Sequence, residues 1–327
     1  MSSTAVDTRR PISYNNPIEI KTTFIDKTYP RYLRELLVDD VMVSRVTVVD
    51  LPMRVGSSII RLGGIAGVET PLRENRMKGY SAALLNDTMN YMIREGYDAS
   101  ALFGIGDFYH RFGYVVYMAE PHNTRFVLQA RHLPVAETPY TAREAAREDM
   151  RAVTELYNDL TYCRTASIYR NPDRFEGFSK GSEWFTPVKA YVLELDGVFA
   201  GYFCVDDKPY RARLTEIGVT TAECYPAIIN FLAELAKREQ AETVALYLAP
   251  DDPFVYHTRR YGMAADIKYF NDGGSMMRII NKDSFLAKIG AGNPDLGDDD
   301  IIRAVTGFEP MAGFPPQVAY MNVNDMF

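Results

Sequence analysis

The sequence contains few of the residues that form disulfide frameworks or metal sites. Its three cysteines, Cys163, Cys204 and Cys224, are odd in number and far apart in the chain. This pattern favours a reducing compartment over a disulfide-bonded secreted fold. The four histidines do not stand at the spacing of zinc ligands, so the sequence predicts no metal site.

Long apolar segments are also missing. No apolar run approaches the roughly 18 residues that a membrane-spanning helix needs. Residues 1–17 are polar and lack the apolar core of a signal peptide. We therefore expect a cytoplasmic protein without a membrane partner.

The charge balance excludes a further class. A formal net charge of −7 argues against nucleic acid or an anionic membrane as the main partner. With 47% hydrophobic and 24% charged residues, the composition is that of a globular protein with sizeable cores. A length of 327 residues indicates two domains, or two and a fragment.

Residues 61–114 carry the most informative pattern. They predict a glycine-interrupted strand, a basic turn, an amphipathic helix, a second strand and an aromatic motif. A helix N-terminus offers unpaired N–H groups and a partial positive charge, which suit phosphate. Arg76 and Lys78 add full charges, and Gly79 lets the backbone approach a ligand closely. Taken alone, this turn is weak evidence for a phosphate site, because most such turns are solvated basic loops.

The remaining elements suggest an internal duplication. In chain order the sequence predicts a helix over 29–38, strands over 41–49, 58–62 and 65–70, a helix over 79–95, a strand over 99–105, a linker over 134–141, a helix over 142–161, a hairpin of 191–195 with 198–205, a strand over 214–219, a helix over 227–239 and a strand over 243–248. Hairpin, strand, helix and strand thus occur twice. The Asp196–Gly197 pair is a strong two-residue turn signal. Beyond 280 we expect two short helical segments.

A family resemblance rests on two motifs in the first half. Arg76-x-x-Gly79-x-Ser81 at a helix start resembles the [Q/R]-x-x-G-x-[G/A] signature of GNAT acetyltransferases, with serine at the last small position. Phe108-Tyr109-His110-Arg111-Phe112-Gly113-Tyr114 resembles the aromatic motif after the next strand in that superfamily. Two tandem halves with a C-terminal extension narrow the resemblance to Eis-like (enhanced intracellular survival) acetyltransferases.

The resemblance implies an α/β (α+β) fold of two tandem GNAT-like domains, with mixed sheets and splayed central strands. It implies acetyl-CoA as the acyl donor, its pantetheine bonded by the backbone of a strand that splays from its neighbour. This splay also offers a reason for the glycines at 63, 64 and 67. The implied cofactor-binding residues are Val68, Glu69, Thr70, Arg76, Met77, Lys78, Gly79, Tyr80, Ser81 and Gly104.

The resemblance also implies two catalytic groups. Tyr109 matches the general acid that protonates the departing thiolate; an unperturbed tyrosine, with a pKa of about 10, is protonated at neutral pH. Eis-like proteins use their own terminal carboxylate as the base and typically end in phenylalanine, as this chain does at Phe327. Glu69 and His110 are the alternative bases, and simple packing is the alternative role for Tyr109.

The second half departs from the pattern, because residues 220–226 contain neither the arginine nor the glycine of the turn and Glu223 would repel phosphate. We expect this half to bind no CoA, to shape the acceptor pocket and to hold Tyr256 in its core. Aromatic residues over 162–185, including Trp184, either line that pocket or simply pack. The predicted domains are a catalytic GNAT domain over 1–135, a degenerate one over 140–280 and a truncated sterol-carrier-like extension over 281–327.

Together these expectations describe an N-acetyltransferase that moves acetyl from acetyl-CoA to an amine by direct attack. The acceptor is a small-molecule amine or a lysine, and a homo-oligomer is a family-based expectation. A CoA-sensing or interaction protein that keeps the fold without turnover is the alternative from another class. A transferase of another acyl group is the third interpretation.

Overall fold

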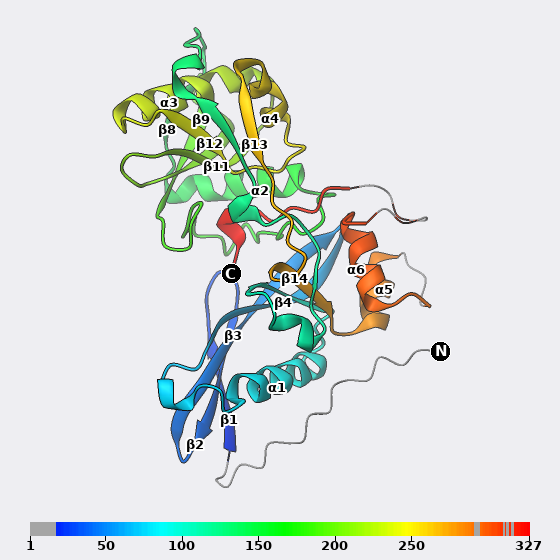
Figure 1. The fold of residues 1–327 in the computed structure, drawn as a ribbon. Helices are drawn as coiled ribbons and strands as arrows, with labels where there is room; N and C mark the ends of the chain where they lie inside the picture. Colours follow the sequence, from blue (N-terminus) through cyan, green and yellow to red (C-terminus); the bar gives the residue numbers. More distant parts are fainter. Residues whose placement is uncertain (1–17, 291–294, 310, 312–313, 315–316) are drawn as a thin grey trace.

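The computed structural model describes residues 18–290, 295–309, 311, 314 and 317–327. Within these residues the chain forms two seven-stranded sheets, which lie one above the other in Figure 1. Each sheet contains both parallel and antiparallel neighbours. The predicted α/β fold of two GNAT-like halves with mixed sheets is confirmed.

The two sheets have the same arrangement of strands. The first sheet has the order β1 (Ile18–Ile25), β2 (Arg31–Val38), β3 (Val41–Val55), β4 (Ser58–Glu69), β5 (Ala99–Gly104), β14 (Gly274–Ile279) and β6 (Val115–Val116). The second sheet, in matching order, has β8 (Thr141–Glu144), β9 (Val188–Leu195), β10 (Val198–Asp206), β11 (Ala212–Val219), β12 (Thr243–Leu246), β7 (Arg125–Gln129) and β13 (Met263–Asp266).

The sixth position of each sheet is filled by a strand from the other half of the chain. β7 follows β6 in sequence but pairs with β12 and β13. β14 follows β13 in sequence but pairs with β5 and β6. This reciprocal exchange interlocks the halves. The predicted domain ranges 1–135 and 140–280 stay predictions. They do not coincide with the two sheets, because β7, within the first range, belongs to the second sheet and β14, within the second range, belongs to the first.

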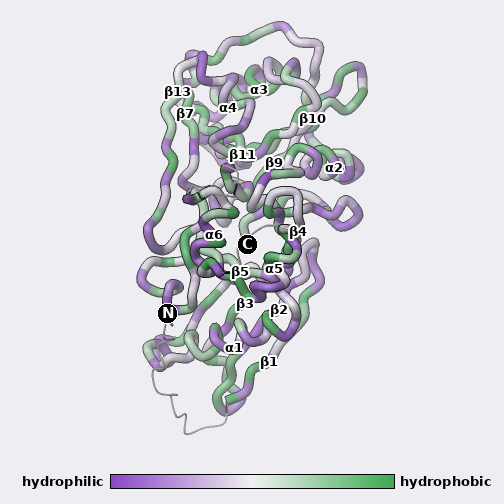
Figure 2. The backbone as a smooth tube through the Cα atoms, turned by 90° about the vertical axis from the view of Figure 1, so that its right-hand side faces the viewer, coloured by the Kyte–Doolittle hydropathy of each residue, from purple (hydrophilic) through white to green (hydrophobic). Residues whose placement is uncertain are grey.

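Helices cover both faces of each sheet. The described helices are α1 (Tyr80–Arg94), α2 (Met150–Leu160), α3 (Tyr225–Arg238), α4 (Pro253–Thr258), α5 (Lys282–Ile289) and α6 (Asp298–Thr306). α1 packs on one face of the first sheet, and α5, α6 and the C-terminal tail pack on the other. In the second sheet, α3 and α4 cover one face and α2 covers the other. Both views place the C-terminus between the two sheets (Figure 1 and Figure 2).

Local turn chemistry explains the hairpins. Asp196 and Gly197 have φ angles of 52° and 78° and join β9 to β10, as the sequence predicted. Two consecutive positive φ angles match the right-handed twist of the flanking strands, and aspartate–glycine tolerates them. Gly56, with φ of 58°, occupies the turn between β3 and β4.

The predicted helix over 29–38 is wrong, because Arg31–Val38 is the strand β2. Its apolar residues fit a helical spacing, but β1 and β3 pair with it on both sides over the whole of its length. Buried Leu36 and Arg34 lie on the face that α1 covers, where Arg34 forms an ion pair with Asp87 of α1. Tertiary pairing thus overrides local propensity.

The predicted helix over 142–161 is only partly correct. α2 begins at Met150, and Thr141–Glu144 instead forms the edge strand β8. The Arg143 guanidinium donates to Glu194 of the neighbouring β9 at 2.9 Å and to Asp149 at 2.7 Å. These cross-strand and turn contacts explain why a charged segment is extended here.

The extension beyond residue 280 is part of the first sheet's core. Phe285 of α5 and Ile301, Ile302 and Val305 of α6 are buried in one cluster with strand residues. Whether this segment derives from a sterol-carrier-like domain stays a prediction. Its attachment includes buried Asp98, which accepts hydrogen bonds from the Arg61 backbone N–H at 2.7 Å and from Ser284 and Lys288 of α5, both at 2.5 Å.

We predict that Asp98→Ala lowers the free energy of unfolding by about 3–5 kcal/mol, because it removes a fully buried carboxylate that three part-buried donors share. Lys288→Gln is the matched control. The Lys288 side chain is 41% exposed, so this variant should lose only about 1 kcal/mol. Urea unfolding followed by circular dichroism measures both. Equal losses in the two variants would contradict the prediction.

Candidate active site

The central strands of the first sheet separate near their C-terminal ends. β4 and β5 pair in parallel from Leu62–Ala99 to Ile65–Leu102, and both strands continue beyond that pair without further pairing to each other. The register between β3 and β4 shifts in this region, where Gly67 has a φ of 57°. Glycine adopts this left-handed conformation without strain, and such bulges bend a strand. The predicted splay is therefore present.

The N-terminus of α1 lies beside the end of β4. Gly79, with φ of 81°, is its N-cap residue, and no side chain caps this end within the described chain. The Ser81 hydroxyl lies 2.8 Å from that of Thr70, which joins the helix start to the strand end. Arg76 also reaches this corner and donates to the Thr70 carbonyl at 3.2 Å.

The other predicted cofactor residues lie in the same region. Val68 and Tyr80 pack against the cluster below α1. Met77 is fully exposed and has a φ of 62°, and Lys78 is also exposed. Glu69 forms an ion pair with Arg45 of β3. The structure thus brings the predicted residues of 68–81 together, and their role in binding a donor stays a prediction.

Tyr109 begins a short 3-10 helix just after β5. Its ring covers Gly104, where an added Cβ would lie 2.4 Å from the Tyr109 ring. The ring also meets Phe108 edge-on at 4.9 Å between centroids. Burial raises the pKa of the Tyr109 hydroxyl, and no charged group contributes to that shift. Tyr109 is therefore protonated at neutral pH.

Phe327 approaches the same strands from the opposite face. Its ring lies against Gly64 of β4, where an added Cβ would fall 2.6–2.8 Å from three ring atoms. It also contacts Phe103 of β5, with 5.4 Å between ring centroids. Tyr109 packs with the α1 cluster, whereas Phe327 packs with the α5–α6 cluster. The place where β4 and β5 separate lies between these two faces.

The two alternative bases are less well placed. Glu69 is engaged by Arg45, as described above. His110 is 48% exposed at its side chain, and its Nδ1 lies 3.5 Å from the Asp272 carboxylate in the loop before β14. Neither contact directs these side chains toward Phe327.

Gly64 gives a direct test of this packing. We predict that Gly64→Ala displaces the Phe327 ring, because the new Cβ would overlap it. If Phe327 carries the base that the family resemblance implies, turnover should then fall by about tenfold or more while donor affinity is unchanged, since misplacing a reacting group slows chemistry. Steady-state kinetics and titration calorimetry measure the two quantities. Gly297→Ala, whose Cβ meets nothing closer than 3.5 Å, is the control, and equal kinetics in all three proteins would contradict the prediction.

An aromatic path leads from Phe327 to the second half. Phe103 contacts Trp184 edge-on at 6.0 Å between ring centroids, and Trp184 meets the His122 ring at 5.1 Å. The Lys180 ammonium lies 3.8 Å from the centroid of the Trp184 ring. Trp184 is 41% exposed, so this path ends at the surface. The aromatic residues over 162–185 were expected either to line a pocket or simply to pack. Among them, Trp184 is the one that contacts Phe103 and His122.

Two nitrogens on this path are buried and have no hydrogen-bond partner in the described chain: Lys180 Nζ and His122 Nε2. His122 Nδ1 lies 2.7 Å from the Ser182 carbonyl oxygen, so Nδ1 carries the proton and Nε2 presents a lone pair. Burial lowers the pKa of His122 to about 4. Burial likewise lowers the pKa of Lys180 to about 7, against the opposing charge of Asp325. Nothing in the sequence distinguished these two residues.

The depressed pKa of His122 makes stability depend on pH. The ordinary value is 6.5, so the unfolded chain binds a proton there before the folded chain does. Stability is therefore lost as pH falls from about 6.5 toward about 4. We predict that the free energy of unfolding falls by about 2 kcal/mol more in the wild type than in His122→Phe when the pH is lowered from 7 to 5. Exposed His132→Gln is the control, and an unchanged pH slope in His122→Phe would be evidence against this account.

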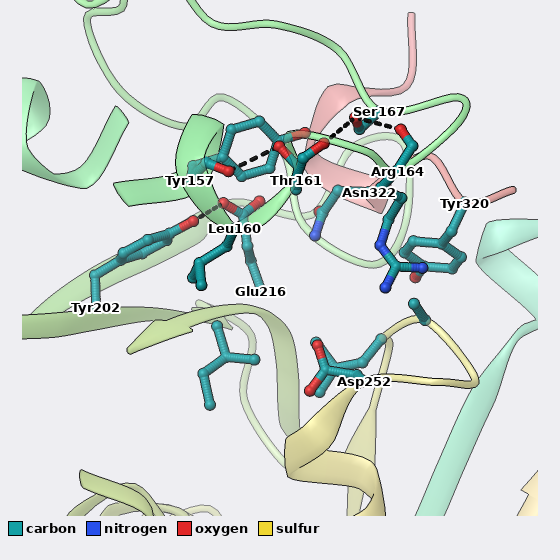
Figure 3. A pocket seen from close by; sticks show the side chains of 13 residues that line it. Tyr157, Leu160, Thr161, Arg164, Ser167, Tyr202, Glu216, Asp252, Tyr320 and Asn322 are labelled. Carbon is teal, nitrogen blue, oxygen red and sulfur yellow. Dashed lines mark hydrogen bonds between the residues drawn. The ribbon is translucent and has the colours of Figure 1, made fainter. Parts of the chain in front are cut away.

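The second half has its own splay and a pocket within it. β11 and β12 pair only as far as Leu214–Leu246, and β11 continues to Val219. A pocket with about 450 Å³ of empty volume, partly open to solvent, lies here (Figure 3). Its lining includes Arg164, Glu216, Asp252 and Tyr320. The C-terminal tail therefore passes the place where β11 and β12 separate before Phe327 reaches the place where β4 and β5 separate.

The turn before α3 differs from that before α1. The Thr221 hydroxyl accepts a hydrogen bond from the Glu223 N–H at 3.4 Å, and Glu223 also accepts from Tyr140 at 3.4 Å. That this half binds no CoA stays a prediction. The expectation that Tyr256 is a core residue is wrong: it is 51% exposed, and the Arg259 guanidinium lies over its ring.

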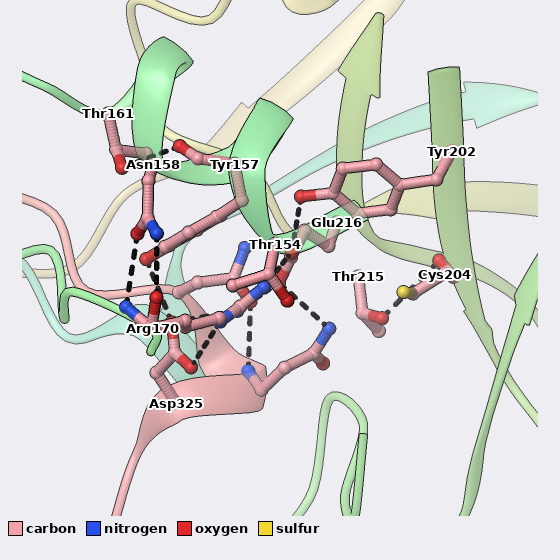
Figure 4. Close-up of polar contacts among 12 residues, drawn as sticks. Thr154, Tyr157, Asn158, Thr161, Arg170, Tyr202, Cys204, Thr215, Glu216 and Asp325 are labelled. Carbon is pink, nitrogen blue, oxygen red and sulfur yellow. Dashed lines mark hydrogen bonds and ion pairs between the residues drawn. The ribbon is translucent and has the colours of Figure 1, made fainter. Parts of the chain in front are cut away.

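A buried ion cluster joins the tail to the second half (Figure 4). Fully buried Arg170 donates to both Glu216 and Asp325, two residues before the C-terminus. The sequence contained no signal for it, since arginine and two acids 46 and 155 residues away form no local pattern. Two other aromatic residues of 162–185 pack nearby. Phe175 belongs to the buried cluster around α2, and the Arg54 guanidinium lies over the ring of Tyr169.

Within the described residues, no helix is long and apolar enough to cross a membrane. The same residues contain no cluster of three or more histidine, cysteine or acidic side chains arranged to hold a metal ion.

Part of the first half matches a known protein family. Residues 31–117 match the family model of an acetyltransferase (GNAT) domain. No curated protein matches the sequence significantly.

Solved structures share the fold at low identity. A GCN5-related N-acetyltransferase from Kribbella flavida is 18% identical with a TM-score of 0.59, covering 76% of this chain and 59% of its own. A probable N-acyltransferase from Enterococcus faecalis is 15% identical with a TM-score of 0.62, covering 80% and 64%. Eis1 from Mycobacterium abscessus is 18% identical with a TM-score of 0.54, covering 78% and 66%. This chain thus spans about 59–66% of their lengths.

Proposed function

Because the first half of this chain contains a GNAT acetyltransferase domain and the whole has the fold of tandem, Eis-like GNAT proteins, we propose that it is an N-acetyltransferase. It transfers acetyl from acetyl-CoA to an amine by direct attack. The observation that carries this proposal is the splay of β4 and β5, with Tyr109 on one face and Phe327 on the other.

The corner between β4 and α1 fits the donor. The start of α1 has no side-chain cap within the described residues, and basic Arg76 and Lys78 stand beside it. Backbone N–H groups and positive charge at a helix N-terminus suit a pyrophosphate. Beyond Ile65, β4 has no β5 partner, which leaves an edge for the pantetheine amides near Val68–Thr70. The donor supplies an activated acyl thioester.

Tyr109 would supply the proton. Partial burial raises the pKa of its hydroxyl, which keeps it protonated in the working range of pH. It follows β5, and its ring covers Gly104 at the end of that strand. It therefore lies beside the separated ends of β4 and β5, where the donor is proposed to bind. Donating to the departing sulfur neutralises the thiolate as the C–S bond breaks.

The terminal carboxylate of Phe327 would receive the proton of the amine. An exposed carboxyl group has a pKa of about 3.5 and is a weak base, but desolvation strengthens it. The Phe327 ring is held between Gly64 and Phe103, next to the end of the paired region of β4 and β5. The amine attacks the acyl carbon, a C–N bond forms, and its proton passes to the carboxylate.

The acceptor would approach from the Phe327 face. Trp184 and Phe103 form an aromatic wall beside Phe327 that reaches the surface. The chain's net charge of −7 favours a cationic amine, either a small molecule or a lysine. A cytoplasmic location and a homo-oligomer stay predictions.

A thiol-release assay with acetyl-CoA and a panel of amines tests the proposal. We predict that Tyr109→Phe lowers kcat by about 10²–10⁴-fold with unchanged donor affinity, because it removes only the proton donor. Tyr256→Phe, which alters the exposed counterpart in the second half, is the control.

Deleting Phe327 should reduce turnover to a low residual rate and preserve donor binding, whereas Phe327→Leu keeps a carboxylate at residue 327 and should retain more activity. Donor binding without turnover for any amine would favour the CoA-sensing alternative. Preference for a longer acyl-CoA would identify another acyl group. Full activity of Tyr109→Phe would refute the assigned acid.

A further inference from the structure

The C-terminal tail contacts both halves of the protein with neighbouring side chains. Met321, Val323 and Met326 are buried in the core of the first sheet. Asn324 and Asp325, between them, instead contact residues of the second half. A chain terminus without such contacts frays. This tail is therefore held from two sides just before Phe327.

Arg170 is the centre of the second-half contacts (Figure 4). Its Nε donates to Asp325 Oδ1 at 2.9 Å, and its Nη2 donates to Asp325 Oδ2 at 2.8 Å. The same guanidinium donates to both oxygens of Glu216, at 2.5 and 2.7 Å. The exposed fractions of the three side chains are 0%, 3% and 2% for Arg170, Asp325 and Glu216. Paired bidentate contacts of this kind fix orientation as well as distance.

Tyrosine side chains complete the cluster. The Tyr157 hydroxyl donates to Asp325 Oδ2 at 2.9 Å, and its ring lies 3.6 Å from the Arg170 guanidinium carbon. The Tyr202 hydroxyl donates to Glu216 at 2.6 Å. The Asn324 amide also donates to Glu216, at 3.2 Å, which adds a second link to the tail. Both carboxylates thus have several donors.

The geometry points to Arg170 as a positioning residue that holds the terminal carboxylate of Phe327 in place through Asp325. This inference rests on the proposed function. Asp325 is fixed on the second half, and the Phe327 ring is fixed against Gly64 and Phe103 on the first. With both points fixed, the carboxylate at the chain end has a restricted range of positions beside the splay. A base held in this way reacts far faster than a mobile one.

The principal variant is Asp325→Asn. The cluster has one cation and two anions, so this change leaves a balanced Arg170–Glu216 pair instead of an unpaired buried charge. The control is Asp50→Asn, which breaks the bidentate pair between Asp50 and Arg61 on β3 and β4. Tyr157→Phe deletes only one hydroxyl donor to Asp325, so it provides a milder variant if Asp325→Asn does not fold.

The first measurement does not depend on activity. A carboxypeptidase that prefers aromatic C-terminal residues releases Phe327, and mass spectrometry follows its rate. We expect release at least about tenfold faster in Asp325→Asn than in wild type, with an intermediate rate in Tyr157→Phe, because a freed terminus enters a protease. Asp50→Asn should match wild type.

The second measurement is turnover. We expect Asp325→Asn to lower kcat by about 10–100-fold with acetyl-CoA affinity unchanged, since the donor corner is on the other face of the sheet. When Phe327 is deleted first, adding Asp325→Asn should lower kcat no further, because the effect of Asp325 passes through the terminus.

Three outcomes would overturn the inference: wild-type release in both cluster variants, faster release with unchanged kcat, or equal loss of kcat in Asp50→Asn. A wild-type protein without turnover would refute the proposed function and the catalytic part of this inference. The release rates would then still decide whether Arg170 and Asp325 anchor the tail.

Discussion

The exchange of one strand between the two sheets is the constraint on which the rest of the structure depends. β7 completes the second sheet and β14 completes the first, so neither sheet is whole without the other half of the chain. Each exchanged strand is paired on both sides, and those backbone hydrogen bonds are made only when both halves fold. This interlock gives the two halves a defined relation, and a tail that spans them can therefore occupy one position.

The candidate site uses this relation. The proposed donor corner is built locally, from the end of β4 and the start of α1. The proposed acceptor face is built from distant segments: Phe103 of β5, Trp184 of the second half and Phe327. The parallel pairing of β4 and β5 ends at Ile65–Leu102, between the face that carries Tyr109 and the face that carries Phe327. The proposed proton donor and the proposed base therefore lie on opposite sides of the place where the strands separate.

The buried cluster around Arg170 illustrates why such contacts are kept. Replacing a buried ion pair by apolar residues is often neutral for stability, whereas removing one partner is costly. Such a cluster therefore contributes more to a unique arrangement than to net stability. Here the arrangement it specifies is the course of the last few residues, because Asp325 accepts from Arg170 and Tyr157 at the same time.

Several elements could be predicted because their signals are local. α1 follows from periodicity and the hairpin at Asp196–Gly197 from turn chemistry, whereas the splay of β4 and β5 was implied by the family resemblance. The segment Arg31–Val38 could not be assigned correctly, because its apolar spacing suits a helix and only pairing with β1 and β3 makes it a strand. Propensity is a weak prior wherever tertiary pairing decides.

The sequence by itself determined the tandem α/β pattern, the basic turn at Arg76–Gly79 and the tyrosine that follows β5, since each depends on neighbours within a few residues. Only the tertiary structure decided that strands are exchanged, that Trp184 and His122 stand beside Phe103, and that Arg170 meets Glu216 and Asp325. The physical reason is the range of the interaction. Contacts between residues 46 to 155 positions apart leave no periodic trace in the chain and exist only once both sheets have formed.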